Sequence, residues 1–315
     1  MTPIPVVIDC DPGHDDAIAL MLAAASPEID LLGVTTVAGN TTVEKTTRNA
    51  LAVLELIGRT DVPVAVGSDV PLERNLVTAE YVHGSTGLDG PELLDPVMQP
   101  HELGAVSFLA RTLAASDQRI TLIPVGPLTN IAMLISAHPD LVERIERIVL
   151  MGGAINLGNV TPAAEFNIYV DPEAADLVFR SGLDITMIGL DVTHQARLTT
   201  DHADQLRPSG TAGAFVADLL DYFVPNYQQR MGFAGAPIHD ALAVAHVIWP
   251  DLVETGTFAV EVDTSAGPSA GRTLVDFFHV TGRETNAKVG VSVESERFAR
   301  GLAERISALD GGPVR

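Results

Sequence analysis

Residues 6–16 read Val6-Val7-Ile8-Asp9-Cys10-Asp11-Pro12-Gly13-His14-Asp15-Asp16, an apolar run that turns at once into a cluster of carboxylates. The apolar run predicts a short buried strand, and a helix is expected to begin near Asp15. Four carboxylates this close repel one another and cannot all stay ionised in a cleft without a compensating cation. Oxygen-only ligands favour Ca²⁺ or Mg²⁺. The stretch therefore predicts a hard metal ion where a strand gives way to a helix.

Strand-like runs alternate with helix-like stretches along most of the chain. This order predicts an α/β fold with an open, mostly parallel sheet and helices on both faces, since the strands are almost continuously apolar. No linker-like stretch divides the sequence, so one domain over residues 1–315 is expected. The expected strands are residues 6–9, 31–37, 62–66, 120–125, 147–151 and 185–190, and the expected helices are residues 15–25, 42–57, 128–137 and 294–309.

Two further features modify this simple pattern. Residues 258–262 and 273–278 predict a small β-hairpin near the C-terminus. The glycine-rich loop at residues 78–96 is expected to be a mobile lid.

Composition limits the classes of partner. Forty-one acidic residues against nineteen basic ones give a net charge of −22, which disfavours nucleic acid and anionic lipid and favours a neutral small molecule. The apolar runs are too short for a membrane span of roughly 20 residues, and no export signal is evident. The single cysteine, Cys10, suits a reducing compartment. A cytoplasmic protein is expected.

Polar residues follow several of the predicted strands. Ligands bind beyond the carboxyl ends of the strands in such sheets, and Asn40, Met151 and Asp191 would lie at this edge together with the opening carboxylates. Two other stretches carry groups suited to a site, Ala164-Glu165-Phe166-Asn167 and Ile238-His239-Asp240. Taken alone, Asp240 is more simply a helix N-cap, and the polar residues of a loop are usually solvated.

Six blocks follow one another in a characteristic order. They are Asp9-Cys10-Asp11-Pro12-Gly13-His14-Asp15-Asp16-Ala17, Thr36-Val37-Ala38-Gly39-Asn40, Gly126-Pro127-Leu128-Thr129-Asn130, Leu150-Met151-Gly152-Gly153, Ala164-Glu165-Phe166-Asn167 and Ile238-His239-Asp240. In type and order these blocks resemble the inosine–uridine family of nucleoside hydrolases, over nearly the whole chain. The resemblance implies the Rossmann-like nucleoside hydrolase fold and a homo-oligomer, either a dimer or a tetramer.

The same resemblance implies one Ca²⁺ at the bottom of the pocket, held by Asp11, Asp16, Asp240 and the main-chain carbonyl of Val125. Many relatives have Thr where this chain has Val125. Because the implied ligand is the main-chain carbonyl, this change of side chain does not remove it. The implied ribose-binding residues are Asp15, Asn40, Met151, Asn159, Glu165 and Asn167. The residues implied at the nucleobase are His83 and His239, with Tyr227 and Arg230 on a loop that closes over it.

This assignment fits the chemistry of N-glycosidic cleavage, which creates positive charge on the ribose ring. Ca²⁺ is a weak activator of water, so a general base is still needed, and Asp11 is the candidate. His239 is the candidate for protonating the departing base, because imidazole titrates near neutral pH. The expected reaction is hydrolysis of inosine, uridine and related ribonucleosides to free ribose and nucleobase.

Alternative interpretations remain open. A pyrimidine-specific hydrolase of the same family and a non-catalytic nucleoside- or ribose-binding protein are both compatible with these residues. A phosphatase of the haloacid dehalogenase type would use Asp9 and Asp11, but it also needs a lysine, and only Lys45 and Lys288 are present. Base preference and the number of subunits do not follow from the sequence.

Several residues near these motifs are expected to have structural roles. Asp9 is expected to orient the carboxylate cluster, and Cys10 and His14 to pack. Asp191 and His194 are expected to have a structural, hydrogen-bonding role. His246 is expected to be a core histidine with its hydrogen bonds satisfied.

Overall fold

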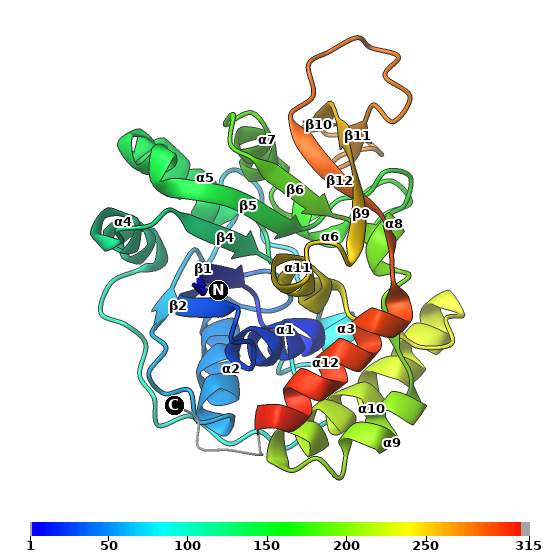
Figure 1. The fold of residues 1–315 in the computed structure, drawn as a ribbon. Coiled ribbons are helices and arrows are strands. Elements are labelled where there is room, and N and C mark those ends of the chain that lie inside the picture. Colours follow the sequence, from blue (N-terminus) through cyan, green and yellow to red (C-terminus); the bar gives the residue numbers. More distant parts are fainter. Residues whose placement is uncertain (1, 310–315) are drawn as a thin grey trace.

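The structure is built on an eight-stranded sheet whose first strand in sequence, β1 (Ile4–Cys10), lies inside it. The computed structural model describes residues 2–309 (Figure 1). The strand order is β3-β2-β1-β4-β5-β6-β12-β9, parallel from β3 to β12, with β9 antiparallel to β12. The other strands of this sheet are β2 (Ile29–Thr36), β3 (Val64–Val66), β4 (Ile120–Pro124), β5 (Ile145–Met151), β6 (Ile185–Ile188), β9 (Val253–Phe258) and β12 (Ala287–Val293).

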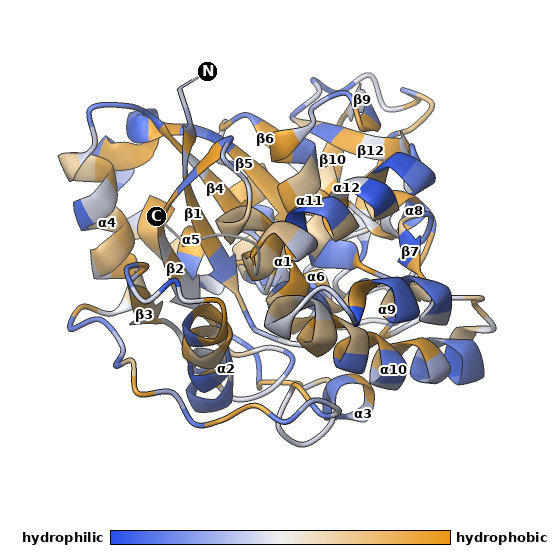
Figure 2. Ribbon diagram, turned by 60° about the horizontal axis from the view of Figure 1, so that its bottom comes forward, coloured by the Kyte–Doolittle hydropathy of each residue, from blue (hydrophilic) through white to orange (hydrophobic). Residues whose placement is uncertain are grey.

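Helices cover both faces of the sheet (Figure 1). One face is covered by α1 (His14–Ala24), α2 (Val43–Leu56), α9 (Thr200–Leu206), α10 (Thr211–Met231), α11 (His239–Ile248) and α12 (Ser295–Leu309). The other face is covered by α4 (Ala105–Ala115), α5 (Thr129–Ala137) and α7 (Pro172–Phe179). Hydrophobic colour dominates the central strands, and hydrophilic colour lies on outward helix faces (Figure 2).

Shorter elements complete the structure. Two pairs of strands form small antiparallel sheets, β7 (Arg197–Leu198) with β8 (Ala236–Pro237) and β10 (Val260–Val262) with β11 (Thr273–Val275). Short helical turns are α3 (Glu80–His83), η1 (Pro139–Arg144), α6 (Phe166–Val170) and α8 (Leu190–Thr193). None of the helices within residues 2–309 combines the length and apolar composition that crossing a membrane requires.

The position of β1 follows from its side chains. Val6 and Ile8 join the core on the α1 face, whereas Val7 joins the core on the α5 face. A strand that is apolar on both sides is stable only when both sides are covered, so β1 lies in the interior of the sheet. Its carboxyl end therefore opens at the middle of the edge where parallel sheets bind ligands.

The predicted α/β fold, with its mostly parallel sheet and small hairpin, is confirmed. The hairpin is shorter than expected, because residues up to Phe258 belong to β9 of the main sheet.

One expectation was wrong. Tyr227 and Arg230 do not lie on a loop but in the last turns of α10, a helix of 21 residues. Pro225 and Gly232 suggest a break, but Pro225 lies inside the helix and Gly232 ends it with φ 71°. Apolar residues at helical spacing, including Phe215, Leu219 and Phe223, are buried and hold the helix across Pro225.

Candidate active site

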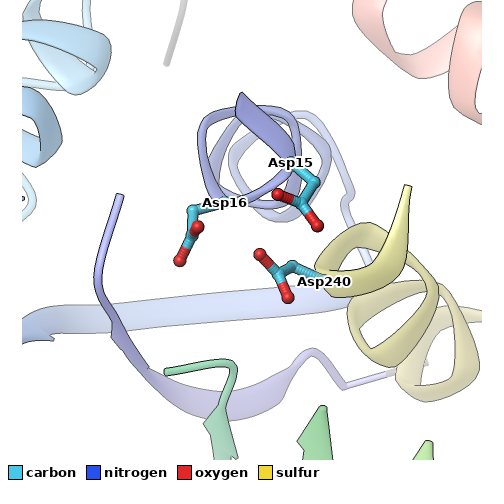
Figure 3. Close-up of side chains that lie close together, drawn as sticks. All are labelled: Asp15, Asp16 and Asp240. Carbon is cyan, nitrogen blue, oxygen red and sulfur yellow. The ribbon is translucent and has the colours of Figure 1, made fainter. Parts of the chain in front are cut away.

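Three carboxylates converge at the carboxyl end of β1. Asp15 and Asp16 come from the first turn of α1, and Asp240 comes from the first turn of α11. One oxygen from each lies within 4.8 Å of the others, and the side chains point into a shared space (Figure 3). All three are buried. The two helices start beside each other, so residues more than 220 positions apart form one cluster of oxygen atoms.

Asp11 lies directly beside this cluster. Its main-chain N–H donates to Asp16 Oδ1 at 3.1 Å, and its Oδ2 accepts from the main-chain N–H of Asn40 at 2.6 Å. Its Oδ1 is buried and has no partner among the described residues. A Cβ on Gly39 would lie 2.1 Å from Asp11 Oδ2, so the Gly39 position must be glycine for the chain to approach so closely.

The electrostatics of the cluster are unfavourable without a cation. Burial, followed by the charge of Asp16, raises the pKa of Asp15 to about 8 and that of Asp11 well above its usual range. Burial and the charges of Asp15 and Asp16 likewise raise the pKa of Asp240. Buried acceptor oxygens with raised pKa values and an unpartnered Asp11 Oδ1 fit a hard cation, which would favour the ionised carboxylates.

The Val125 carbonyl faces the same region. It accepts a hydrogen bond from Asn167 Nδ2 at 2.7 Å, and the same amide donates to the Met151 carbonyl at 3.1 Å. A carbonyl oxygen has two lone pairs, so the bond from Asn167 leaves one for another partner. Asn167 thus joins the ends of β4 and β5 to the pocket.

A second set of polar groups borders the pocket. Glu165 caps α6, accepting from the main-chain N–H groups of Gly153 at 2.9 Å, Asn167 at 3.0 Å and Ile168 at 3.2 Å. Burial raises its pKa to about 7 despite these bonds. Asn159 also lines the pocket, and its Oδ1 is buried and has no hydrogen-bond partner within residues 2–309. These groups offer acceptors and donors suited to hydroxyls.

Aromatic and imidazole groups form the opposite wall. Both ring nitrogens of His239 are hydrogen-bonded, Nδ1 with the Thr193 hydroxyl at 2.7 Å and Nε2 with the Tyr227 hydroxyl at 2.9 Å. Burial lowers the pKa of His239 well below its usual value and raises that of Tyr227. At the mouth, the Arg230 guanidinium lies over the Tyr81 ring, 4.6 Å from its centre. Both His239 and Tyr227 are therefore neutral in this wall.

One cleft of about 660 Å³, counted with the solvent space at its mouth, unites most of the residues singled out in the sequence. Its lining includes Asp15, Asn40, His83, Val125, Met151, Asn159, Glu165, Asn167, Tyr227, Arg230, His239 and Asp240. Asp11 and Asp16 are absent from the lining and lie behind Asn40 and Asp15, which they contact. The structure therefore brings the set together, and the role of each residue stays a prediction.

The cleft also contains residues that the sequence analysis missed. They are Ala79, Tyr81, Val82, Phe166, Asn226 and Met231. Phe166 belongs to the motif Ala164-Glu165-Phe166-Asn167, and Tyr81 is two positions from His83. Closeness in sequence to a predicted site residue was therefore the only signal that could have indicated them. Asn226 donates to the Val82 carbonyl at 3.1 Å and joins α10 to α3.

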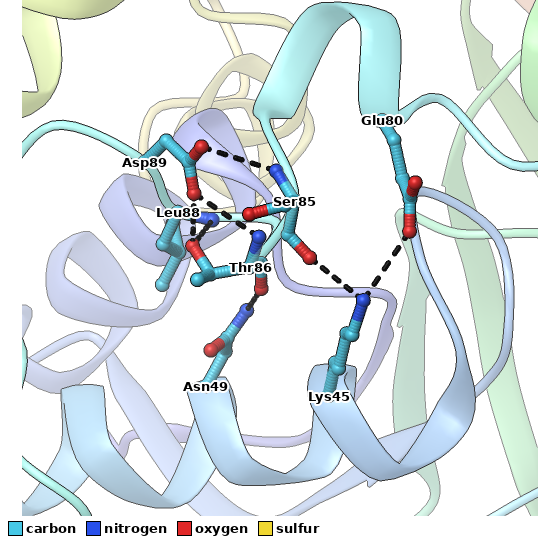
Figure 4. Close-up of polar contacts among 7 residues, drawn as sticks. All are labelled: Lys45, Asn49, Glu80, Ser85, Thr86, Leu88 and Asp89. Atoms are coloured by element: carbon cyan, nitrogen blue, oxygen red, sulfur yellow. Dashed lines mark hydrogen bonds and ion pairs between the residues drawn. The ribbon is translucent and has the colours of Figure 1, made fainter.

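The loop expected to be a lid has many fixed contacts (Figure 4). Asn49 Nδ2 donates to the Thr86 carbonyl at 2.9 Å and to the Pro12 carbonyl at 3.1 Å. Lys45 Nζ donates to the Ser85 carbonyl at 2.7 Å, and Asp89 accepts from the main-chain N–H groups of Ser85 and Thr86. Helix α2 thus holds the loop against the carboxylate-bearing turn, and mobility of the loop stays a prediction.

The residues expected to be structural lie around the site. His14 stacks on Tyr222 and Phe223, and Cys10 is fully buried. Asp9 accepts from Asn130 Nδ2 at 2.8 Å beneath the cluster, and Asp191 accepts from the main-chain N–H of Ile155 at 2.6 Å.

Two histidines depart from this expectation. His246 is buried as expected, but its Nδ1 has no hydrogen-bond partner among the described residues, so it is not satisfied. Similarly, His194 packs edge-on against Phe233 and its Nε2 has no partner within residues 2–309.

Comparison with known proteins identifies the family. Residues 6–300 match the family model described as inosine-uridine preferring nucleoside hydrolase. The chain belongs to this nucleoside hydrolase family. The predicted family and the prediction that the protein is an enzyme, an N-glycosyl hydrolase, are therefore confirmed.

Individual members of the nucleoside hydrolase family are similar over almost their whole length. A pyrimidine-specific ribonucleoside hydrolase, RihA, of Escherichia coli O81 (strain ED1a) is 48% identical, covering 96% of this chain and 98% of RihA. Among solved structures, the purine-preferring ribonucleoside hydrolase from Gardnerella vaginalis has a TM-score of 0.91 and 36% identity, covering 97% of this chain and 99% of that one. A plant nucleoside hydrolase has a TM-score of 0.90 and 35% identity, with the same coverage.

Proposed function

We propose that this nucleoside hydrolase cleaves the N-glycosidic bond of pyrimidine ribonucleosides, uridine and cytidine, to free ribose and nucleobase. The observation that carries the proposal is the cleft itself, in which buried carboxylates, hydroxyl-binding groups and a neutral His239–Tyr227 pair face one another. Such a cleft suits a neutral sugar joined to a planar base.

The pyrimidine preference rests on sequence similarity. The RihA relative, named pyrimidine-specific, is 48% identical, whereas the structure named purine-preferring is 36% identical. The alternative is that the protein catalyses the same hydrolysis on inosine and other purine nucleosides.

We assign the metal as Ca²⁺, with Asp11, Asp16, Asp240 and the Val125 carbonyl as its protein ligands. The support is the buried, oxygen-only donor set and the unpartnered Asp11 Oδ1. When bound, Ca²⁺ supplies a template that holds ribose hydroxyls and water and neutralises the buried carboxylates.

The chain's own groups account for the rest of the reaction. Asp15, Asn40, Asn159, Glu165, Asn167 and the Met151 main chain bind the ribose. Asp11 accepts a proton from the attacking water, as a general base. The neighbouring carboxylates stabilise the positive charge that develops on the ribose ring, because they are fixed in place before the reaction.

The departing base meets His239 and Tyr227, and His83 and Arg230, which also line the cleft, are proposed to contact it. His239 is proposed to supply the hydrogen bond or proton that the base needs. Because Tyr227 already occupies Nε2, any proton leaving that nitrogen meets the Tyr227 hydroxyl first.

One assay tests the proposal. Purified protein is offered uridine, cytidine, inosine, adenosine and guanosine in phosphate-free buffer, and reducing sugar is measured before and after chelation and after Ca²⁺ is restored. Ribose from uridine and cytidine that depends on Ca²⁺ is expected. Tight nucleoside binding without ribose would favour the non-catalytic binding protein, and release that is indifferent to chelation would contradict the metal assignment.

Three further points belong to the proposal. We expect the whole chain to act as one domain, since no linker-like stretch divides it, and to be cytoplasmic, as its single cysteine indicates. We also expect a homo-oligomer, either a dimer or a tetramer, as the family resemblance implies. Analytical ultracentrifugation measures the number of subunits.

A further inference from the structure

Thr193 lies at the end of α8, on the far side of His239 from Tyr227. Its side chain is completely buried, and its hydroxyl is 2.7 Å from His239 Nδ1. Among residues 2–309, the Thr193 hydroxyl has no other hydrogen-bond partner. The same holds for the Tyr227 hydroxyl, 2.9 Å from Nε2. Three groups thus form a row that ends in the cleft.

We propose that Thr193 is a positioning residue that fixes His239 in its Nε2–H tautomer, so that the Tyr227 hydroxyl donates a hydrogen bond to an acceptor atom of the departing base. This inference rests on the proposed function and deepens it. It assigns a role to a threonine that is not among the residues lining the cleft.

The number of hydrogens on these three groups limits how they can bond to one another. A neutral imidazole carries one N–H, and each hydroxyl carries one O–H. With the proton on Nε2, the Thr193 O–H donates to Nδ1, Nε2–H donates to the Tyr227 oxygen, and the Tyr227 O–H is free to point into the cleft. Every hydrogen then has an acceptor once a base is bound.

The other tautomer leaves a buried donor unpaired. With the proton on Nδ1, that N–H donates to Thr193, and the Thr193 O–H has no acceptor within the described residues. A buried unpaired donor is unfavourable. Tyr227 would also donate to Nε2 and offer only lone pairs to the base. His239 is buried and each of its ring nitrogens contacts a hydroxyl group, so the choice between the two neutral tautomers decides the direction of both hydrogen bonds.

This arrangement requires a hydrogen-bond acceptor on the base of the substrate. Tyr227 presents a donor, so the base must present an acceptor, such as a ring nitrogen or a carbonyl oxygen that gains electron density as the N-glycosidic bond breaks. No net proton transfer along the row is required, because a hydrogen bond that strengthens as charge develops lowers the barrier.

The test compares Thr193→Val, which keeps the shape but removes the hydroxyl, with Thr193→Ser, which retains it. The control is Thr121→Val at a buried threonine on β4 that is not part of the cleft. Thr193→Val is expected to lower kcat on uridine about tenfold, part of the roughly 10²–10⁴-fold that acid–base groups contribute, with KM unchanged. Activity on p-nitrophenyl riboside, whose leaving group needs no such donor, is expected to persist, and Thr193→Ser to restore most of the loss.

Equal loss on both substrates in Thr193→Val, or wild-type kcat on uridine, would overturn the inference. A second measurement is independent of turnover. The ¹⁵N spectrum of the Ca²⁺-loaded wild type, with the His239 signals identified by His239→Gln, is expected to show protonated Nε2, and protonated Nδ1 would overturn the assignment. If the wild type releases ribose from no nucleoside, the proposed function fails, whereas the tautomer measurement still decides the role of Thr193.

Discussion

Asp11 has one buried carboxylate oxygen that lacks a hydrogen-bond partner among the described residues, while its other oxygen accepts from the main-chain N–H of Asn40. A carboxylate held this way can accept a proton from water without rearranging. The flanking glycines, Gly39 and Gly126, leave no room for side chains over it, since a Cβ at Gly126 would lie 2.6 Å from Asp11 Oδ1. The site therefore depends on the backbone around this residue as well as on the residue itself.

Asp11→Asn should lose at least about 100-fold in kcat, because a general base contributes roughly 10²–10⁴-fold. The fold should persist, since one of several mutually repelling buried carboxylates becomes neutral. Steady-state kinetics and circular dichroism measure the two effects, with Asp30→Asn on the exposed side of β2 as the control. Unchanged kcat in Asp11→Asn would remove Asp11 from the mechanism.

His239→Ala should lower kcat on nucleosides and spare substrates with good leaving groups. The reason is that it removes the partner that orients Tyr227, at 2.9 Å. Rates on uridine and on p-nitrophenyl riboside are compared for the wild type and the variant. A loss of the same size on both substrates would count against any role of His239 at the departing base.

Helix α2 connects the two loops that build the site. Asn49, buried in this helix, donates one N–H to the Pro12 carbonyl of the carboxylate-bearing turn and the other to the Thr86 carbonyl, three residues beyond His83. The positions of Asp11 and His83 are therefore coupled through a single amide group. A histidine that lines the cleft is thus held in place partly by a helix outside the cleft.

Asn49→Asp replaces both donors by acceptors and should lower the free energy of unfolding by about 1–3 kcal/mol, the usual effect of leaving buried hydrogen-bonding groups unpaired. KM for uridine should rise, because the loop that carries His83 loses its anchor. Thermal denaturation and steady-state kinetics measure these effects. Gln118→Glu, the same type of change at an exposed turn, is the control, and an unchanged KM in Asn49→Asp would show that the loop positions His83 without α2.

Local patterns predicted most of the elements, whereas the main residues of the site followed from the family resemblance. Continuous apolar runs such as residues 6–8 indicate buried strands, and motif order places Asp240 with Asp16. The position of Tyr227 in helix α10 was not predicted, because Pro225 indicates a break that the packing of buried residues such as Phe215 and Phe223 overrides, whereas Gly232 does end the helix. The partnership of Thr193 with His239 depends on how α8 and α11 meet, which no local pattern contains.

At the scale of the whole molecule, the buried acids make the stability of the metal-free protein depend on pH. In the folded protein the pKa is about 7 for Asp9, about 8 for Asp15 and about 7 for Glu165, and burial is the main cause that raises each above its ordinary value of 3.8 to 4.5. The folded state therefore binds more protons than the unfolded state between these limits. By linkage, its free energy of unfolding falls as pH rises through this range.

Chelated protein should thus lose stability as pH rises from about 5 to 8. Added Ca²⁺ should raise Tm and flatten the loss, since a ligand that binds only the folded state adds about 2.7 kcal/mol at 100 times its Kd. Thermal scans across pH, with chelator and with Ca²⁺, measure both effects. A Tm at pH 8 that does not respond to Ca²⁺ would contradict a metal site among these carboxylates, and Mg²⁺ in place of Ca²⁺ tests the choice of ion.

The order of strands has a consequence for folding during synthesis on the ribosome. Strand β12, from residues 287–293, inserts between β6 and β9, although β6 is made about 100 residues earlier. Until then β6 is an open parallel edge with unpaired N–H and C=O groups, a surface prone to joining other chains. Asp240 also arrives late, so a nascent chain that already contains the opening carboxylates lacks the residue that completes their cluster. A chain that ends before residue 287 therefore keeps an open strand edge at β6 and is expected to aggregate more readily than the full chain.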